Sequence, residues 1–299
     1  IENMQKLQFK LKLLGLKMLK KLELLKYINF KSSIYLNKNK ITVPFVNGIG
    51  FTNFVLSKNW IDGLLESFVD KNRTFIDVGV NIGQTLLRVK TLYPELEYLG
   101  FEPNSTCTSY TQQLIKINRF NACIIQNCAL SDSVANLILE KSYLEDSRAS
   151  VISSLRPNYF NEKENVLALD YQSFYMDKEI SFVKIDVEGA EYEVLKGMKD
   201  ALVKYKPIIA CEVLDSHASD TFDFTQKRAT LVSELLKSID YEIIQIQANE
   251  ISIITYNKID TILIKQWTDE SEFLNDYLFY PSEKKESVFE KLNNIIKAN

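Results

Sequence analysis

Residues 74–83, Thr-Phe-Ile-Asp-Val-Gly-Val-Asn-Ile-Gly, constrain the fold of this chain more than any other stretch. The apolar run at 75–78 predicts a short buried strand, and a helical pattern follows over 84–92. Glycines in the turn between them allow positive φ angles and close backbone approach, and the helix start leaves N–H groups free for a ligand. A strand, a glycine turn and a helix in this order are typical of the front edge of a nucleotide pocket.

Strands and helices alternate through most of the remaining chain. We expect strands at residues 75–78, 97–101, 123–127, 166–169, 181–186 and 207–213. We expect helices at residues 60–68, 84–92, 105–117, 189–204 and 229–239. This alternation predicts an α/β fold, with a mostly parallel sheet covered by helices on both faces. Two late β-rich runs, 241–247 and 260–265, are expected to form an antiparallel hairpin at the edge of the sheet.

The N-terminal segment is strongly basic, with ten lysines and two glutamates in residues 1–40. Apolar residues recur there at helical spacing: Leu7, Leu11, Leu14, Met18, Leu22 and Leu25. The pattern predicts a basic amphipathic helix over residues 4–28. Such a helix can contact an anionic membrane face or a partner protein, or can lay its leucines on the main domain or on a second subunit, and the sequence leaves these alternatives open. A small β-hairpin is expected at 41–57.

We divide the 299 residues into a basic helical arm (1–40), a main catalytic or binding domain (41–270) and a helical tail (271–299). The net charge of −3 argues against a nucleic-acid-binding protein. Because His217 is the only histidine, a multi-histidine metal site is excluded, and no metal is expected. The four cysteines lack CxxC spacing, which is typical of thiols in a reducing compartment. With no apolar run near the roughly 20 residues of a membrane span, we expect a cytoplasmic location, with peripheral contact at the inner membrane face as one option.

Acidic residues follow several of the expected strands. Glu102 ends the second strand about 20 residues after the glycine turn, where a carboxylate can accept hydrogen bonds from both ribose hydroxyls. Taken with Asp77 in the turn, it indicates a nucleoside-containing cofactor. The turn has the spacing G-x-N-x-G rather than the G-x-G-x-x-G of a dinucleotide site, so it disfavours a nicotinamide-dependent dehydrogenase and suits a nucleoside with an amino-acid tail.

A second signal is the run Phe-Val-Lys-Ile-Asp-Val-Glu-Gly-Ala-Glu at 182–191, where an apolar strand again ends in acids, glycine and a helix. Ligands of open α/β sheets gather at the carboxyl ends of the strands, so Asp77, Glu102, Asp186 and Glu212 should share one rim. Glu188 and Glu191 have a second interpretation, since acids also stabilise a helix N-terminus by roughly 0.3–1 kcal/mol.

Five motifs occur in an order that resembles the FkbM family of S-adenosylmethionine-dependent methyltransferases: Phe-Ile-Asp-Val-Gly-Val-Asn-Ile-Gly (75–83), Gly-Phe-Glu-Pro (100–103), Ala-Leu-Ser-Asp (129–132), Ala-Leu-Asp (168–170) and Val-Lys-Ile-Asp-Val-Glu-Gly-Ala-Glu (183–191). The resemblance covers roughly residues 74–214, and Lys-Ile-Asp-Val-Glu-Gly is its most specific part. It departs at Val80, where alanine is usual. The resemblance implies a class I methyltransferase (Rossmann-like) fold with a seven-stranded sheet, S-adenosyl-L-methionine as cofactor, and transfer to hydroxyl groups, often of sugars or natural products.

The resemblance also implies roles for individual residues. Asp77, Gly79 and Asn81 would contact the amino-acid end of the cofactor, and Glu102 would bind the ribose. Ser131 and Asp132 would lie near the adenine. Asp186 would lie near the reacting methyl group. The full set of expected cofactor-binding residues is Asp77, Gly79, Asn81, Gly83, Glu102, Ser131, Asp132 and Asp186.

A hydroxyl acceptor is a weak acid, so a general base near it would assist the reaction. The candidate catalytic residues are Asp186, Glu188, Glu212 and His217. His217 is also open to a simpler interpretation as a solvated loop histidine. Acceptor recognition is expected in the segments 133–165 and 214–227, where Tyr143, Tyr159 and Tyr171 could stack on a sugar ring or serve as ordinary packing.

The expected function is O-methylation of a sugar, glycan or glycolipid precursor, with a carbohydrate or other small hydroxyl-bearing molecule as the acceptor. The alternative is a catalytically inactive methyltransferase-fold protein that acts as a binding module or scaffold anchored through its N-terminal helix. Residues 4–28 would then provide the contact with a membrane or with a second copy.

Overall fold

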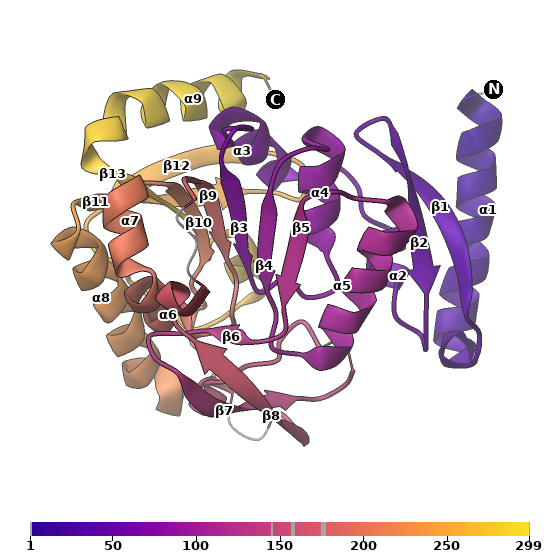
Figure 1. Ribbon diagram of the computed structural model, residues 1–299, viewed down its shortest axis with the longest axis horizontal. Helices are drawn as coiled ribbons and strands as arrows, with labels where there is room; N and C mark the ends of the chain where they lie inside the picture. Colours follow the sequence, from indigo (N-terminus) through magenta and orange to yellow (C-terminus); the bar gives the residue numbers. More distant parts are fainter. Residues whose placement is uncertain (1, 145, 157–158, 175–177, 299) are drawn as a thin grey trace.

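The computed structural model describes residues 2–144, 146–156, 159–174 and 178–298, with side chains undescribed at residues 2–8, 153, 270 and 272. Its centre is an eight-stranded sheet in the order β12-β11-β13-β10-β9-β3-β4-β5 (Figure 1). The strands are β3 (Thr74–Val78), β4 (Tyr98–Phe101), β5 (Cys123–Gln126), β9 (Ile180–Ile185), β10 (Ile208–Glu212), β11 (Tyr241–Ala248), β12 (Ile253–Ile259) and β13 (Asp276–Pro281). The five strands from β5 to β10 run parallel, while β13 pairs antiparallel with both β10 and β11. The mostly parallel α/β sheet is therefore confirmed.

The far edge of the sheet differs from the sequence-based expectation in two ways. The hairpin partner of β11 is β12 rather than residues 260–265. With β12 the sheet has eight strands, one more than the seven expected. Residues 271–299 are not wholly helical, because β13 forms inside them and inserts between β10 and β11. The sequence Asp-Tyr-Leu-Phe-Tyr-Pro of β13 is apolar and aromatic, as a buried central strand requires.

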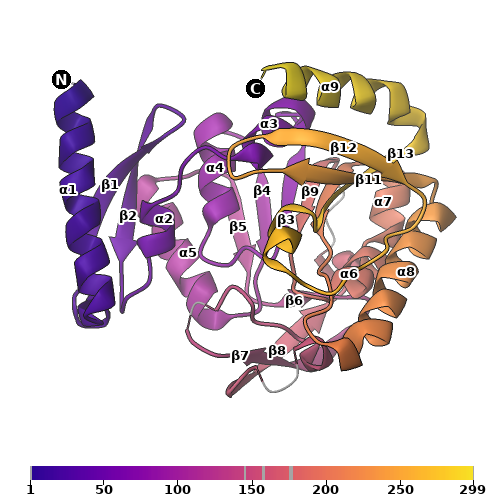
Figure 2. The same cartoon turned by 180° about the vertical axis from the view of Figure 1, so that it is seen from behind.

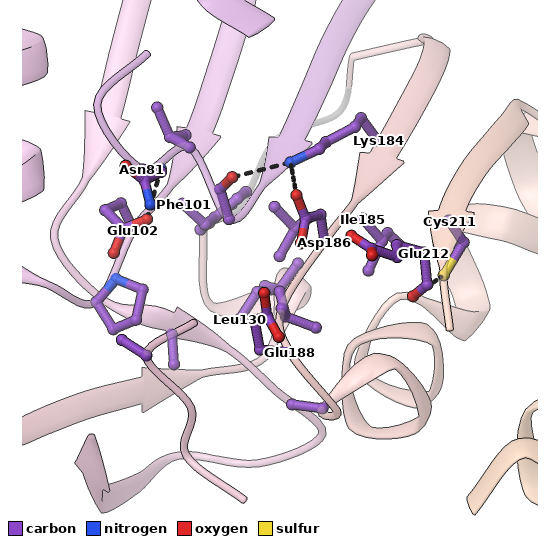
Figure 3. A pocket seen from close by; sticks show the side chains of 18 of the residues that line it. Asn81, Phe101, Glu102, Leu130, Lys184, Ile185, Asp186, Glu188, Cys211 and Glu212 are labelled. Atoms are coloured by element: carbon purple, nitrogen blue, oxygen red, sulfur yellow. Dashed lines mark hydrogen bonds and ion pairs between the residues drawn. The ribbon is translucent and has the colours of Figure 1, made fainter. Parts of the chain in front are cut away.

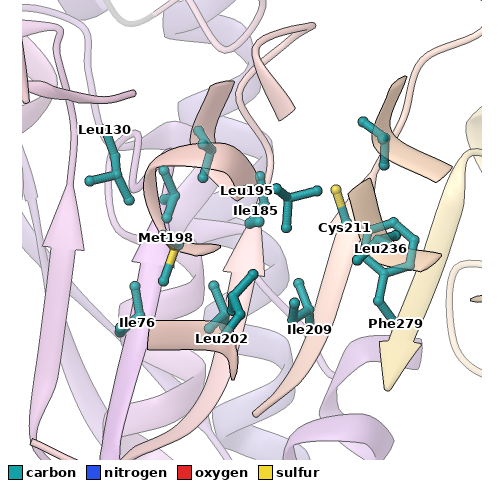
Figure 4. Close-up of a cluster of buried hydrophobic side chains, with 14 of the residues drawn as sticks. Ile76, Leu130, Ile185, Leu195, Met198, Leu202, Ile209, Cys211, Leu236 and Phe279 are labelled. Atoms are coloured by element: carbon teal, nitrogen blue, oxygen red, sulfur yellow. The ribbon is translucent and has the colours of Figure 1, made fainter. Parts of the chain in front are cut away.

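Helices cover both faces of this sheet. One face carries α3 (Trp60–Phe68), α4 (Gln84–Leu92) and α9 (Lys285–Ala298) (Figure 2). Apolar residues of these helices pack with Phe75, Tyr98 and Phe182 of the sheet. The other face carries α6 (Glu191–Gly197), α7 (Lys199–Tyr205) and α8 (Phe222–Ser238). Figure 4 shows the second core, in which Leu195, Leu202 and Leu236 of these helices, and Met198 between α6 and α7, pack against the strands. The expected helix at 189–204 is thus two helices, and the helix expected at 229–239 begins at Phe222.

A separate three-stranded sheet lies beyond the carboxyl ends of the main strands. It consists of β6 (Ala129–Leu130), β8 (Glu162–Leu169) and β7 (Ala135–Lys141), in that order. The strand expected at 166–169 is part of β8 and so belongs to this small sheet, not to the main one. The helix α5 (Ser105–Asn118) links β4 to β5.

The N-terminus forms α1 (Glu2–Lys21), a short 3-10 turn (Leu24–Tyr27) and a hairpin of β1 (Phe30–Leu36) and β2 (Asn39–Phe45), followed by α2 (Phe51–Phe54). The hairpin expected at 41–57 therefore lies earlier, and a boundary at residue 40 would cut through it. Its two-residue turn has positive φ at Asn37 and Lys38, the geometry that matches the twist of a hairpin. Among the helices in the described ranges, none is long and apolar enough to cross a bilayer.

Candidate cofactor and active site

A cavity of about 560 Å³ lies at the carboxyl ends of β3, β4, β9 and β10. Residues of the small sheet, among them Leu130 and Leu139, form another part of its wall. Its volume falls in the range of small-molecule sites, about 300–1,000 Å³. Eight of the residues expected at a site line it: Gly79, Asn81, Glu102, Ser131, Asp132, Asp186, Glu188 and Glu212. The topology explains this convergence, because parallel strands present their carboxyl ends at one rim.

The turn after β3 brings backbone atoms to the cavity wall. Gly79 has φ of +85°, and a Cβ atom at this position would lie 1.8 Å from the carbonyl oxygen of Asp186. Only glycine fits so close an approach between the β3 and β9 turns. Gly83, with φ of +86°, is the N-cap of α4, and a Cβ atom there would meet Leu114 and Thr111 of α5. It does not line the cavity, and its contact with a cofactor stays a prediction.

The carboxylate of Glu102 is held in place by two backbone amides, of which Figure 3 shows the one from Asn81. The amide of Asn81 donates to Oε2 at 2.7 Å, and the amide of Asn104 donates to Oε1 at 2.8 Å. The side chain is only 7% exposed, and burial raises the pKa of Glu102 to about 7 against the opposing effect of those two amides. Each oxygen keeps a lone pair that can accept a further hydrogen bond from a ligand hydroxyl.

Asp77 lies beneath the cavity rather than in its wall. Its side chain is fully buried, accepts a hydrogen bond from the hydroxyl of Tyr98, and lies 3.6 Å from Nζ of Lys184. Burial raises the pKa of Asp77. Asp77 is therefore not one of the residues that line the cavity, and its contact with a cofactor stays a prediction. It supports Lys184, which does line the cavity.

Lys184 lines the cavity but is not among the predicted site residues, although it lies within the motif at 183–191. Its Nζ donates to the carbonyl oxygen of Gly79 at 3.0 Å and to Oδ2 of Asp186 at 3.1 Å (Figure 3). Although burial lowers the pKa of Lys184, the carboxylates of Asp186 and Asp77 raise it above its ordinary value. The ammonium group thus joins the two glycine-containing turns and fixes the position of Asp186.

Four carboxylates gather at the end of the cavity formed by β9, β10 and β13: Asp186, Glu188, Glu212 and Asp276. Asp276 pairs in register with Glu212 across the β10–β13 ladder. Burial raises the pKa of Glu188 and of Asp276 to about 7, and raises that of Glu212 well above its ordinary value. Asp276 is absent from the predicted site because residues 271–299 were expected to form a helical tail; the apolar run that follows Asp276 is the signal that could have revealed the strand.

His217 lies outside this cavity. Its Nε2 is 3.1 Å from Nη2 of Arg156, and its ring stacks on Trp267. Arg156 in turn forms an ion pair with Glu188 at 2.7 Å. Burial, followed by the charge of Arg156, lowers the pKa of His217 to about 4. The imidazole is therefore one side chain removed from the cavity wall.

The remaining expected residues are divided between the cavity and its surroundings. Asp132 lines the cavity and forms an ion pair with Lys196 at 2.7 Å. Of the two segments expected to recognise the acceptor, 133–165 contributes cavity-lining residues and 214–227 contributes none. Tyr171 is buried in the core, while Tyr143 and Tyr159 are exposed and do not line the cavity. Glu191 accepts a hydrogen bond from the amide of Gly189 at 2.7 Å at the start of α6, in keeping with its interpretation as a helix-terminus residue.

Comparison with known proteins finds similarity to methyltransferases. The model of the methyltransferase FkbM domain matches residues 77–243. Methyltransferase 1 of Beauveria bassiana is 25% identical over 198 residues, which cover 56% of this chain and 78% of that protein. Methyltransferase sdnD of Sordaria araneosa is 26% identical over 159 residues, which cover 43% of this chain and 61% of that protein.

Among solved structures, the methyltransferase FkbM from Methylobacillus flagellatus aligns with 18% identity and a TM-score of 0.44, over 70% of this chain and 44% of that one. This chain thus spans less than half the length of that crystallised protein. The family assignment rests instead on the domain model, which covers more than half of the sequence. The chain belongs to the FkbM methyltransferase family.

Proposed function

We propose that this chain is an S-adenosylmethionine-dependent O-methyltransferase acting on a hydroxyl of a sugar, a glycan or a glycolipid precursor. The observation that carries the proposal is the carboxylate of Glu102, held by two backbone amides on the wall of the cavity beside the glycine turn. A carboxylate in this position can accept hydrogen bonds from both hydroxyls of a ribose.

The other lining residues suit the rest of such a cofactor. Ser131 and Asp132 lie at the end of β6 and would bind near the adenine. The turns at Gly79 and Asp186 offer backbone groups and a carboxylate for the amino-acid end. When bound, the cofactor would supply a methyl group on a positively charged sulfonium, and that charge would favour the ionised form of the carboxyl groups at this end of the cavity.

Methyl transfer to oxygen requires an aligned acceptor and a group that takes its proton. Three of the four candidate bases line the cavity: Asp186, Glu188 and Glu212. Glu188, with a pKa of about 7, is suited to exchange a proton near neutral pH. Carboxylates also accept hydrogen bonds from the hydroxyls of a polyhydroxylated acceptor, which supports a sugar. Oxygen as the target atom is supported by the family resemblance.

The test has a binding step and a turnover step. Isothermal titration should show that S-adenosylmethionine binds the wild-type protein and binds Glu102→Ala much more weakly. Incubation with the cofactor and a glycan extract should then add the mass of one CH₂ group to a glycan, as detected by mass spectrometry. Binding without turnover on any glycan would favour the inactive scaffold, and unaltered binding by Glu102→Ala would contradict the assigned site.

A further inference from the structure

The helix α1 has apolar side chains on two opposite sides. The inner side packs on the hairpin and α2: Phe9 stacks on Phe54 with ring centroids 5.3 Å apart, and Leu13, Leu16 and Leu19 join the same cluster. These residues, and not the leucine stripe recognised in the sequence, attach the helix to the protein. Figures 1 and 2 both place α1 at the outer edge of the molecule, beside β1 and β2.

The outer side carries Leu11, Leu14 and Met18, and the stripe continues to Leu22, the first residue after the helix, whose amide still donates to the carbonyl oxygen of Met18. The exposed fractions of these four side chains are, in chain order, 60%, 68%, 62% and 56%. At 100° per residue the four side chains fall within an arc of about 80°, directly opposite the inner side. Just beyond the helix, Tyr27 and Ile28 are also exposed. The alternative in which these residues pack on the main domain therefore does not hold for the stripe; among the residues of the sequence pattern whose side chains are described, Leu25 is the buried one.

Lysines flank this stripe. The described lysines of α1 are Lys10, Lys12, Lys17, Lys20 and Lys21, all exposed, and the sequence holds no acidic residue between Glu2 and Glu23. By the same helical geometry, Lys10, Lys17 and Lys21 follow one flank of the stripe and Lys12 the other. The apolar stripe is thus bordered by positive charge, while the chain as a whole is slightly acidic.

We propose that α1 binds flat on an anionic lipid bilayer, with the four apolar side chains among the acyl chains and the lysines at the level of the lipid phosphates. An apolar stripe bordered by lysines is typical of interfacial helices, in which the long lysine side chains reach back to the headgroups. A second copy of the chain fits less well, because residues 1–40 of each copy carry ten lysines against two glutamates and would repel each other. This inference is independent of the proposed methyl transfer.

The test is co-sedimentation of the whole protein with phosphatidylcholine vesicles, with and without phosphatidylserine. Binding is expected with phosphatidylserine at low salt, and should weaken as salt is added. The double variant Leu14→Gln/Met18→Gln should bind at least about ten-fold more weakly. The triple variant Lys10→Gln/Lys17→Gln/Lys21→Gln should bind on the order of 100-fold more weakly at low salt, from about five-fold per lysine.

Matched control variants separate the helix from general surface effects. Ile254→Gln/Leu263→Gln changes apolar residues that are 58% and 71% exposed elsewhere on the chain, and should bind like the wild type. Lys199→Gln/Lys227→Gln/Lys237→Gln removes three exposed charges away from α1 and should reduce binding far less than the α1 triple variant. All of the substituted side chains are exposed, so circular dichroism should show an unchanged fold.

Three results would overturn the proposal: no sedimentation with phosphatidylserine vesicles at low salt, binding unchanged by the α1 variants, or equal losses in α1 and control variants. Light scattering provides a further check. If the protein does not bind vesicles but forms a dimer that Leu14→Gln/Met18→Gln dissociates, the stripe is instead a contact with a second copy.

Discussion

Replacing Glu102 by glutamine should remove a specific part of the pH dependence of stability. Burial raises the pKa of Glu102 from its ordinary 4.5 to about 7, so the folded protein holds this proton more tightly than the unfolded chain. The resulting stabilisation is complete below about pH 4.5 and is lost as the pH rises through about 7. A difference of roughly 2.5 pKa units corresponds to about 3 kcal/mol of unfolding free energy. Glutamine carries no titrating proton, so the unfolding free energy of Glu102→Gln does not contain this pH-dependent decrease.

The assay is urea unfolding of both proteins at about pH 5 and about pH 9, with the difference in unfolding free energy compared between the two conditions. Glutamine can accept from only one of the two amides of Asn81 and Asn104, which costs about 1–3 kcal/mol at either pH and cancels in the comparison. From about pH 5 to about pH 9, the unfolding free energy of the variant should therefore fall by about 3 kcal/mol less than that of the wild type. Glu290→Gln, at an exposed position of α9, is the control and should show no such difference from the wild type.

Parallel pH profiles for the wild type and Glu102→Gln would refute this reasoning. They would mean that Glu102 is not desolvated in the folded protein, and hence that it does not lie in a closed cavity wall. The same variant can also be tested for binding of S-adenosylmethionine. If it loses binding and shows the smaller fall in unfolding free energy with pH, then Glu102 binds the cofactor at the cost of lower stability above neutral pH.

Three further predictions concern the cavity and its surroundings. Asp186→Ala should abolish turnover while weakening cofactor binding less than Glu102→Ala does; isothermal titration giving the reverse order would overturn the roles of these two acids. Gly79→Ala would place a Cβ atom 1.8 Å from a carbonyl oxygen at a φ of +85°, and should cost about 2 kcal/mol or more in a urea melt, whereas Gly15→Ala, with open space around it, should not destabilise the protein. His217→Ala should leave the rate and its pH profile unchanged, because the ring lies behind Arg156; a shifted profile in steady-state assays would restore the histidine as a candidate base.

The parallel half of the sheet was predictable because its signals are local. The pattern at 84–92 coincides with α4, and the apolar runs that become β3, β4, β9 and β10 lie within a residue or two of their expected bounds. Their shared direction follows from the alternation with helices, and it places the acids after them on one rim without any knowledge of side-chain contacts.

The errors arise where long-range pairing decides the structure. β13 follows a stretch without regular strands at 260–275, and only its insertion between β10 and β11 reveals it as a central strand that delivers Asp276. The direction in which α1 faces could not be predicted either, because both of its sides carry leucines at helical spacing. Which side is buried depends on the aromatic surface of Phe54 and its neighbours.

The central claim is that Glu102 binds the ribose of an adenosine-containing cofactor in the cavity beside the glycine turn. A crystal structure of the protein grown with S-adenosylhomocysteine tests this most directly. We expect the ribose hydroxyls within hydrogen-bonding distance of the two oxygens of Glu102, with the amino-acid end toward the turn at Gly79. Ligand density elsewhere on the protein, or a ribose that does not contact Glu102, would contradict the account.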